Sequence, residues 1–388
     1  MRFTCIILRA NCLINFSKMI VDMLDYIYGN VLFYGLIVLL FASLLSMYWV
    51  PFFHKLSTDK DLTDSPSARK SHSFQVPILG GVAVVLSTGI PIVLISIFFQ
   101  DILVLTTASI VGSGSIILLV LGVQDDIGGL KPLTKLIFQI CIALFTLYTL
   151  QINIENMNGL LGIFELPKII SILLSVFVYV IFMNMLNLID GIDGLASGLS
   201  LIAFTFFAYI SYSTGNVFTS IICMSAIGGL LPFIYYNMFS VKKIFLGDNG
   251  SLTLGFVLGF ISLELLSTEN FDVSSLLGLN TPLVLMSLFS FPLVDTLRVF
   301  TIRVLRKRSP FSADKNHIHH HLLRLGLSHR FATLLILVYT ILITILSCLL
   351  LELNINFAFV VLLPIAVFCI CLPVFLERRA DGSIQFRH

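Results

Sequence analysis

Charged residues are scarce in this sequence. Asp, Glu, Lys and Arg make up 11% of the 388 residues, whereas hydrophobic residues make up 57%, and the mean hydropathy is +1.02. This composition excludes a water-soluble globular domain, in which roughly a quarter of the residues are charged. The seven cysteines lie in or beside apolar segments without metal-type spacing, so we interpret them as small core residues.

The apolar runs also lack any alternation with polar residues. A lipid-facing barrel strand requires that alternation, whereas a continuous run of about 20 apolar residues crosses about 30 Å of hydrocarbon as a helix. We therefore predict an all-α polytopic membrane protein with about eleven transmembrane helices in a lipid bilayer. Their predicted cores are residues 31–50, 78–99, 102–121, 132–150, 167–186, 195–211, 217–238, 252–267, 281–299, 331–351 and 356–375.

The flanks of the apolar region are short. Residues 1–30 form an N-terminal leader, which is either an extracytoplasmic segment or an extension ahead of an alternative start at Met19 or Met23. We assign residues 31–375 to one integral membrane domain and residues 376–388 to a short tail.

Basic residues are unevenly distributed between the two sides of the predicted membrane. If the loop that holds Lys55 and Lys70 is cytoplasmic, alternation of the helices places 19 of the 23 Lys and Arg residues on that side or at the inner helix ends. Cytoplasmic loops are enriched in Lys and Arg. The bias therefore predicts an N-terminus outside and a C-terminus in the cytoplasm.

Two adjacent acids follow the third predicted helix, in the string LGVQDDIGGLKPLTK. Asp125 and Asp126 lie where a helix leaves the membrane, and Lys135 follows after a Gly-Gly turn. Neighbouring carboxylates suit a cation or a proton-abstracting role, because their mutual repulsion and a nearby metal set their proton affinity. An ordinary pair of acids at a helix end is the alternative.

The string NMLNLIDGIDGLASG follows the fifth predicted helix. A helix would stack Asn184, Asn187 and Asp190 on one face, and Asp193 lies beyond a glycine. Their oxygens are hard ligands suited to Mg²⁺ or to the hydroxyl and imide groups of a nucleoside. The alternatives are a Ca²⁺-binding loop or a plain turn, although the twelve-residue EF-hand spacing is absent.

A single carboxylate, Asp248, lies between two glycines in the string GDNGS, which opens the eighth predicted helix. A helix N-terminus stabilises an anion, and Mg²⁺ is commonly bound by one or two carboxylates before substrate phosphates complete its shell. A simple N-cap is the alternative, and the two roles are compatible.

Four histidines, His317, His319, His320 and His321, lie between Lys315 and Arg324 in the longest predicted cytoplasmic loop. No cysteine accompanies them and no carboxylate has the spacing of a zinc enzyme. Imidazoles beside basic residues suit the oxygens of a diphosphate, as donors or as an acid. A zinc site and a merely solvated loop are the alternatives.

These loops can share one site only if the inner ends of the helices meet. Hard oxygen ligands together with phosphate-binding cations would then support Mg²⁺-assisted phosphoryl chemistry, in which the metal neutralises a diphosphate and positions its leaving group. The membrane location predicts that one substrate is a lipid.

Four of these motifs, in this order, resemble those of a known family. Asp125-Asp126, NLIDGIDG at 187–194, GDNGS at 247–251 and HIHHH at 317–321 are similar to motifs of the polyprenyl-phosphate N-acetylhexosamine-1-phosphate transferases, the WecA, TagO and MraY superfamily. The resemblance covers about residues 50–330. It implies transfer of a sugar-1-phosphate from a UDP-sugar to undecaprenyl phosphate, with release of UMP.

Two features resemble the WecA-like branch of that family. Two predicted helices follow the histidines, and the string SPFSADKNHIHH also looks like this branch, which implies UDP-GlcNAc as the donor rather than UDP-MurNAc-pentapeptide. An MraY-type transferase is the alternative within the family, and a membrane transporter is the alternative from another class. A transporter places coupling charges at mid-membrane, where Glu264 is the only acid well inside a predicted span, and no internal repeat is evident.

The resemblance also implies roles for individual residues, although His321 stands where many relatives have arginine. The implied catalytic residues are Asp125, Asp126, His317, His319 and His320; the substrate-binding residues are Lys70, Lys135, Asp190, Asp193 and Asn237; the metal-binding residues are Asn187 and Asp248.

The same resemblance implies the partners and the location. The cofactor is Mg²⁺, with Mn²⁺ as a substitute, and the substrates are a UDP-N-acetylhexosamine and undecaprenyl phosphate. No nucleic acid is expected, and a homodimer is compatible with the family. The implied location is the bacterial inner membrane, with the active site on the cytoplasmic face.

Overall fold

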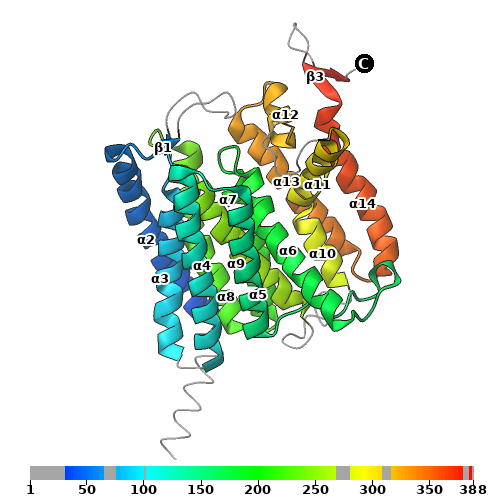
Figure 1. The fold of residues 1–388 in the computed structure, drawn as a ribbon, viewed down its shortest axis with the longest axis horizontal. Helices are drawn as coiled ribbons and strands as arrows, with labels where there is room; N and C mark the ends of the chain where they lie inside the picture. The colour runs from blue at the N-terminus through cyan, green and yellow to red at the C-terminus, as the bar shows by residue number, and fades with distance from the viewer. Residues whose placement is uncertain are drawn as a thin grey trace, which may run out of the picture.

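The structure is a computed structural model that describes residues 31–64, 76–99, 102–267, 280–307, 316–378 and 384–386. The predicted leader, Lys70 and Lys315 lie outside these described residues. In the described part the chain forms one bundle of helices, with α12 and the C-terminal strands at the same end of the bundle (Figure 1).

Helices dominate the described residues. The α-helices are α2 (Val31–Asp59), α3 (Gly80–Phe99), α4 (Ile102–Gly128), α5 (Pro132–Leu150), α6 (Lys168–Ile189), α7 (Leu195–Ser213), α8 (Val217–Ile234), α9 (Gly247–Leu266), α10 (Thr281–Leu288), α11 (Ser290–Leu305), α12 (Ile318–Arg324), α13 (His329–Leu349) and α14 (Ile355–Cys371). Shorter turns are η1 (Leu160–Gly162), the π-helical η2 (Tyr235–Phe239) and η5 (Leu372–Val374). Two antiparallel strand pairs complete it, β1 (Thr63–Asp64) with β2 (Val76–Pro77) and β3 (Leu376–Arg378) with β4 (Ile384–Phe386).

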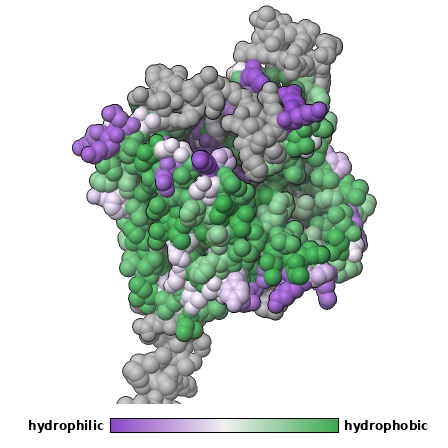
Figure 2. Space-filling model, viewed as in Figure 1, coloured by the Kyte–Doolittle hydropathy of each residue, from purple (hydrophilic) through white to green (hydrophobic). Residues whose placement is uncertain are grey.

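The structure confirms the all-α membrane class. Ten helices of the described residues are long and apolar enough to cross a membrane, or eleven if α10 and α11 together form one span. Figure 2 shows apolar side chains over the middle of one face of the molecule, with hydrophilic residues gathered toward its two ends. This distribution suits a multi-pass protein whose middle is solvated by hydrocarbon.

One predicted span is not a single helix. The run expected at 281–299 is divided at Phe289, where α10 and α11 meet at an angle of 72°. Pro292 explains the break, because proline has no N–H to donate to the carbonyl of Leu288 and is tolerated in the first turn of a helix. The bend lets α11 leave the bundle axis, which matters for the site described below.

Helix α9 is the most enclosed of the candidate spans, because 89% of its 18-residue apolar stretch is buried inside the protein. Glycines permit this close packing. A side chain at Gly255 would lie 2.6 Å from the carbonyl oxygen of Phe182 on α6, and one at Gly114 on α4 would lie 2.5 Å from the ring of Phe256. The N-terminus of α9, which carries Asp248, is therefore held at the centre of one end of the bundle.

Backbone hydrogen bonds fix the segment that precedes α9. Phe245 donates its N–H to the carbonyl of Pro77 (2.8 Å), while Gly80 and Gly81 at the start of α3 donate to the carbonyls of Phe245 (3.0 Å) and Leu246 (2.9 Å). Because these amides belong to the first turn of α3, they have no partner inside their own helix. The entry to α9 is thus tied to the entry to α3.

The predicted tail begins with β3 and lies at the end of the bundle that also carries α12 (Figure 1). This agrees with the prediction that the tail and the histidines share one side. Which side of a membrane this end faces stays a prediction.

Candidate functional site

A cavity of about 360 Å³ opens at the end of the bundle where α4, α5, α6, α11 and α12 meet. It contains most of the side chains that the sequence singles out, and seven of the predicted site residues line it. These are Asp125, Lys135, Asn187, Asp190, His317, His319 and His320. The structure thus brings together motifs that lie almost 200 residues apart in the sequence.

Lys135 joins two of the predicted acids. Its Nζ donates to Oδ2 of Asp125 (2.9 Å) and to Oδ2 of Asp248 (2.5 Å). The side chains of Lys135 and Asp125 are mostly buried, and that of Asp248 is 29% exposed. A single cation therefore lies between two carboxylates whose charges would otherwise repel each other.

Asp248 lies in the first turn of α9, as the sequence predicts, and Gly247 before it has a left-handed φ of 71°. Its Oδ1 accepts a hydrogen bond from Nδ2 of Asn187 (2.6 Å), which also donates to the hydroxyl of Ser251 (3.0 Å). Oxygen and nitrogen of an amide are assigned from such partners, so rotation of the Asn187 amide would present its oxygen to a cation at the same place.

Asp126 turns away from the cavity toward the start of α9. Its carboxylate accepts the backbone N–H groups of Asp248 (3.0 Å) and Asn249 (3.1 Å) and the side-chain amide of Asn249 (2.6 Å). The two backbone N–H groups are donors at a helix N-terminus that have no partner within the helix, and a negative charge stabilises them. The two adjacent acids therefore do different things: Asp125 faces the cavity, and Asp126 caps the helix that carries Asp248.

Asn184 and Asn187 lie on one face of α6, as predicted, while Asp190 caps its C-terminus rather than continuing the helix. Asn184 donates to Oε1 of Gln139 (2.8 Å), which anchors α6 to α5. Asp190 lines the cavity, where burial and the nearby carboxylates of Asp248 and Asp126 raise its pKa well above the ordinary value. A cation bound nearby would relieve that repulsion.

Asp193 and Asn237 lie beside the cavity rather than in its lining. Asp193 is 2% exposed and forms an ion pair with Lys243. The amide of Asn237 accepts from the N–H of Gly194 (2.5 Å) and donates to the carbonyl of Ile244 (2.8 Å), so it ties the end of the Asp190 turn to the segment before α9. Asp193 and Asn237 therefore hold the loop that follows α6 in place, by contacts outside the cavity lining.

The predicted histidine loop begins a short helix, α12, with His317 at its N-cap. The rings of His317 and His319 are stacked at 5.6 Å, and those of His319 and His320 lie 4.3 Å apart. Burial, then the neighbouring His320, lowers the pKa of His319 well below its ordinary value, so this ring is neutral. His321 lies outside the cavity lining, and burial followed by Arg324 lowers its pKa to about 4.

Two groups at this site were not singled out from the sequence. Arg303 on α11 is 3% exposed and lines the same cavity as Asp125 and Asp190. Asp295, also on α11, is fully buried and contacts His317. The sequence carried a signal for both, because charged residues in an apolar helix are costly and usually mark function or an ion pair.

The donor set suits a magnesium ion better than a zinc ion. No group of three His, Cys, Asp or Glu side chains is arranged as a metal centre in the part of the chain that the structure describes. A hard cation would instead use Asp248 and the amide of Asn187, which are already in contact beside the ammonium group of Lys135. Mg²⁺ commonly accepts so few protein ligands, since substrate phosphates and water complete its shell.

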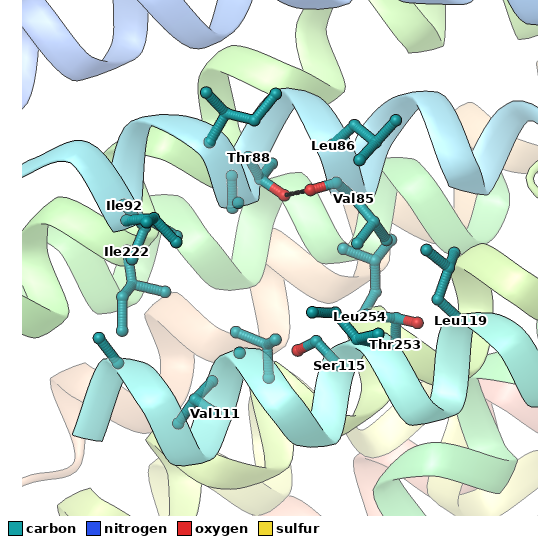
Figure 3. A pocket seen from close by; sticks show the side chains of 18 of the residues that line it. Val85, Leu86, Thr88, Ile92, Val111, Ser115, Leu119, Ile222, Thr253 and Leu254 are labelled. Carbon is teal, nitrogen blue, oxygen red and sulfur yellow. Dashed lines mark hydrogen bonds between the residues drawn. The ribbon is translucent and has the colours of Figure 1, made fainter. Parts of the chain in front are cut away.

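A second cavity of about 360 Å³ lies among α3, α4, α8 and α9 and has a different character (Figure 3). Its lining is almost wholly aliphatic. The hydroxyl of Thr88 donates to the carbonyls of Val84 (3.0 Å) and Val85 (3.1 Å), and that of Thr253 donates to the carbonyl of Asn249 (2.8 Å). These two hydroxyls are satisfied within their own helices, and the described residues of the lining include no charged side chain to bind a phosphate or a metal.

Comparison with known proteins agrees with the motifs. The family described as "Glycosyl transferase family 4" matches residues 107–266. A Bacillus subtilis protein named "Probable undecaprenyl-phosphate N-acetylglucosaminyl 1-phosphate transferase" is 30% identical over 302 residues, which is 78% of this chain and 81% of that protein.

Two further relatives match a shorter stretch. "Decaprenyl-phosphate N-acetylglucosaminephosphotransferase" of Mycolicibacterium smegmatis is 37% identical over 121 residues, 30% of each chain. "Undecaprenyl-phosphate alpha-N-acetylglucosaminyl 1-phosphate transferase" of Escherichia coli K12 is 32% identical over 130 residues, 33% of this chain and 34% of that protein.

Proposed function

The chain belongs to the family of polyprenyl-phosphate N-acetylhexosamine-1-phosphate transferases, and we propose that it transfers GlcNAc-1-phosphate from UDP-GlcNAc to undecaprenyl phosphate. An oxygen of the lipid phosphate attacks the sugar-bearing phosphorus, a new diphosphate bond forms, and the diphosphate bridge of the donor breaks. UMP leaves, and a lipid-linked diphosphosugar remains. The names of the Bacillus subtilis and Escherichia coli relatives support the acceptor and the sugar.

One observation carries the proposal. Lys135 lies between Asp125 and Asp248 in the same cavity that Arg303 and the histidines of α12 line. Acidic groups able to hold a divalent cation and basic groups able to bind diphosphate oxygens therefore face one space at the end of a membrane bundle. Positioning and electrostatic stabilisation are the main requirements of phosphoryl transfer.

The residues divide the work between them. Asp248 and Asn187 would hold Mg²⁺, which when bound neutralises the donor diphosphate and stabilises the leaving UMP. Asp125 lies at the cavity surface, where its carboxylate can orient or deprotonate the incoming lipid phosphate. Lys135 donates to both carboxylates, and its ammonium group can donate to a phosphate oxygen once the donor binds.

The basic wall binds the donor from the other side. Arg303 offers a planar fork of donors to phosphate oxygens. His320 adds a ring donor and His317 lines the same wall, while burial lowers the pKa of His319, which packs over Gly191, where a side chain would lie 2.6 Å from its Nε2. We place the diphosphate between this wall and the acids.

We further propose that this end of the bundle faces the bacterial cytoplasm, where UDP-sugars are made. The distribution of Lys and Arg supports that orientation. The two helices that follow α12, namely α13 and α14, support the WecA-like branch over an MraY-type transferase. Association into homodimers is compatible with either.

The test is UMP release by the purified protein in lipid nanodiscs with undecaprenyl phosphate. The panel of donors contains UDP-GlcNAc, UDP-GalNAc and UDP-MurNAc-pentapeptide, each with and without Mg²⁺. We expect UMP from UDP-GlcNAc only with the metal, and its loss in Asp248→Ala. The control is Glu264→Gln, which neutralises a buried acid bonded to Thr219 away from the cavity. Turnover of UDP-MurNAc-pentapeptide alone would favour the MraY-type function, and uptake of UDP-GlcNAc into sealed proteoliposomes without UMP release would favour a transporter.

A further inference from the structure

Asp295 is a fully buried carboxylate on α11 that does not line the cavity. Its Oδ2 lies 2.8 Å from Nδ1 of His317, and this imidazole is itself 5% exposed and does line the cavity. An acid that is hidden from the site thus contacts a histidine that faces it. The bend between α10 and α11 directs α11 toward α12 and permits this contact.

The other oxygen of Asp295 holds the backbone at the start of α12. Oδ1 accepts the N–H of Ile318 (3.0 Å) and a guanidinium N–H of Arg298 (3.0 Å), and Arg298 also donates to the carbonyl of Asn316. Each neighbour of Asp295 is therefore a donor. A buried carboxylate is tolerated only when it is satisfied in this way.

We propose that Asp295 is a positioning residue for His317, an inference that rests on the proposed function. The carboxylate accepts the proton on Nδ1, which fixes the tautomer and the ring orientation and leaves Nε2 for the cavity. By holding Ile318 as well, Asp295 sets where His317 lies along α12. The unprotonated Nε2 of His317 then faces the cavity in a fixed orientation, as an acceptor for a hydroxyl or amide N–H of the bound donor.

A single substitution separates this role from general support of the fold. Asp295→Asn keeps the size of the side chain, and its amide oxygen can still accept from Ile318. Its amide nitrogen would face Nδ1 of His317, so Nδ1 must become an acceptor and the proton moves to Nε2. We expect UMP release to fall about 10- to 100-fold, the usual effect of removing a group that fixes the tautomer of a functional histidine.

The readout is ¹⁵N NMR of protein labelled at histidine, with the His317 signal assigned by its loss in His317→Ala. In the unsubstituted protein we expect a protonated Nδ1, and in Asp295→Asn an unprotonated Nδ1. Glu264→Gln is the matched control, because it also neutralises a buried acid; it should retain both the activity and the His317 signal.

Several results would overturn the inference. It is wrong if Nδ1 of His317 carries no proton in the unsubstituted protein, a measurement that stands even if Asp295→Asn does not fold. It is also wrong if the folded Asp295→Asn variant keeps full activity or an unchanged His317 tautomer. If the unsubstituted protein releases no UMP, the proposed function fails, while the NMR result still decides whether Asp295 orients His317.

Discussion

Gly122 should be essential for activity although it carries no functional group. A Cβ at this position on α4 would lie 2.6 Å from the carbonyl carbon of Asp248 and closer still to the backbone of Asn249, whereas ordinary contacts begin at 3.4 Å. The obstacle is backbone, which cannot rotate out of the way. Gly122→Ala must therefore move the N-terminus of α9, with Asp248, by about 1 Å relative to α4.

The expected loss follows from that displacement. Overpacking of a tight contact costs about 1–3 kcal/mol of stability, and a catalytic group misplaced by about 1 Å costs about 100-fold in rate. We expect UMP release to fall about 100-fold, with a modest decrease in melting temperature. The loss of rate comes from the contact of Asp248 with Lys135. Asp125 remains on α4 while Asp248 moves with α9, so the distance between the two acids that Lys135 joins changes.

Gly112 provides the matched control on the same helix. A Cβ there would meet nothing within 4 Å, and alanine has a helix propensity about 1 kcal/mol better than glycine. Gly112→Ala should keep wild-type activity and stability. Full activity in Gly122→Ala, or an equal loss in both variants, would refute the idea that close approach of α4 and α9 positions Asp248.

Three further predictions concern the charges. Asp126→Asn should lower activity and should lower the unfolding free energy by roughly 2–4 kcal/mol, because an amide nitrogen would face N–H groups that now donate to the carboxylate. Chemical denaturation measures the unfolding free energy, and unchanged stability would contradict the capping role. Lys135→Met should reduce turnover at least 10-fold and raise the KM for the acceptor, because Asp125 and Asp248 then repel each other and the substrate phosphate loses a cation. Steady-state kinetics in nanodiscs measures both constants, and an unchanged KM would contradict the phosphate contact. Removal of Mg²⁺ by a chelator should abolish UMP release, and more Mg²⁺ should be needed at pH 6 than at pH 8, because the raised pKa of Asp190 keeps a proton in the cavity that a cation must displace; a pH-independent requirement would count against this.

The number and type of the helices were predictable because the membrane leaves few choices. Continuous apolar runs can only be helices in hydrocarbon, and their length follows from its thickness. The break at Phe289 was missed because it changes direction without interrupting the apolar run. Pro292 was the local signal, and its position in the first turn of α11 becomes clear only once the preceding helix is seen to end.

The site was predictable to the level of motifs but not of roles. Asp125 and Asp126 are indistinguishable in a sequence, and only the approach of α9 makes one of them a helix cap. Arg303 resembles the other arginines of its loop until α11 turns it toward the cavity. Contacts between distant helix ends decide such roles, and they leave no local periodicity to detect.

The closest packing and the proposed chemistry coincide at the start of α9. This explains why Asp125 faces the cavity while Asp126 caps the helix. The two oxygens of Asp126 accept the backbone N–H groups of Asp248 and Asn249 and the side-chain amide of Asn249 at one helix N-terminus, whose partial positive charge favours a carboxylate. If both acids faced the cavity, the helix would lose its cap and three carboxylates would compete for Lys135. Because Asp126 binds the amides, Asp125 and Asp248 share the ammonium group of Lys135, and a metal cation can bind as a second positive charge. The arrangement thus fixes Asp248, whose oxygens accept from Asn187 and Lys135 and keep further lone pairs for a metal.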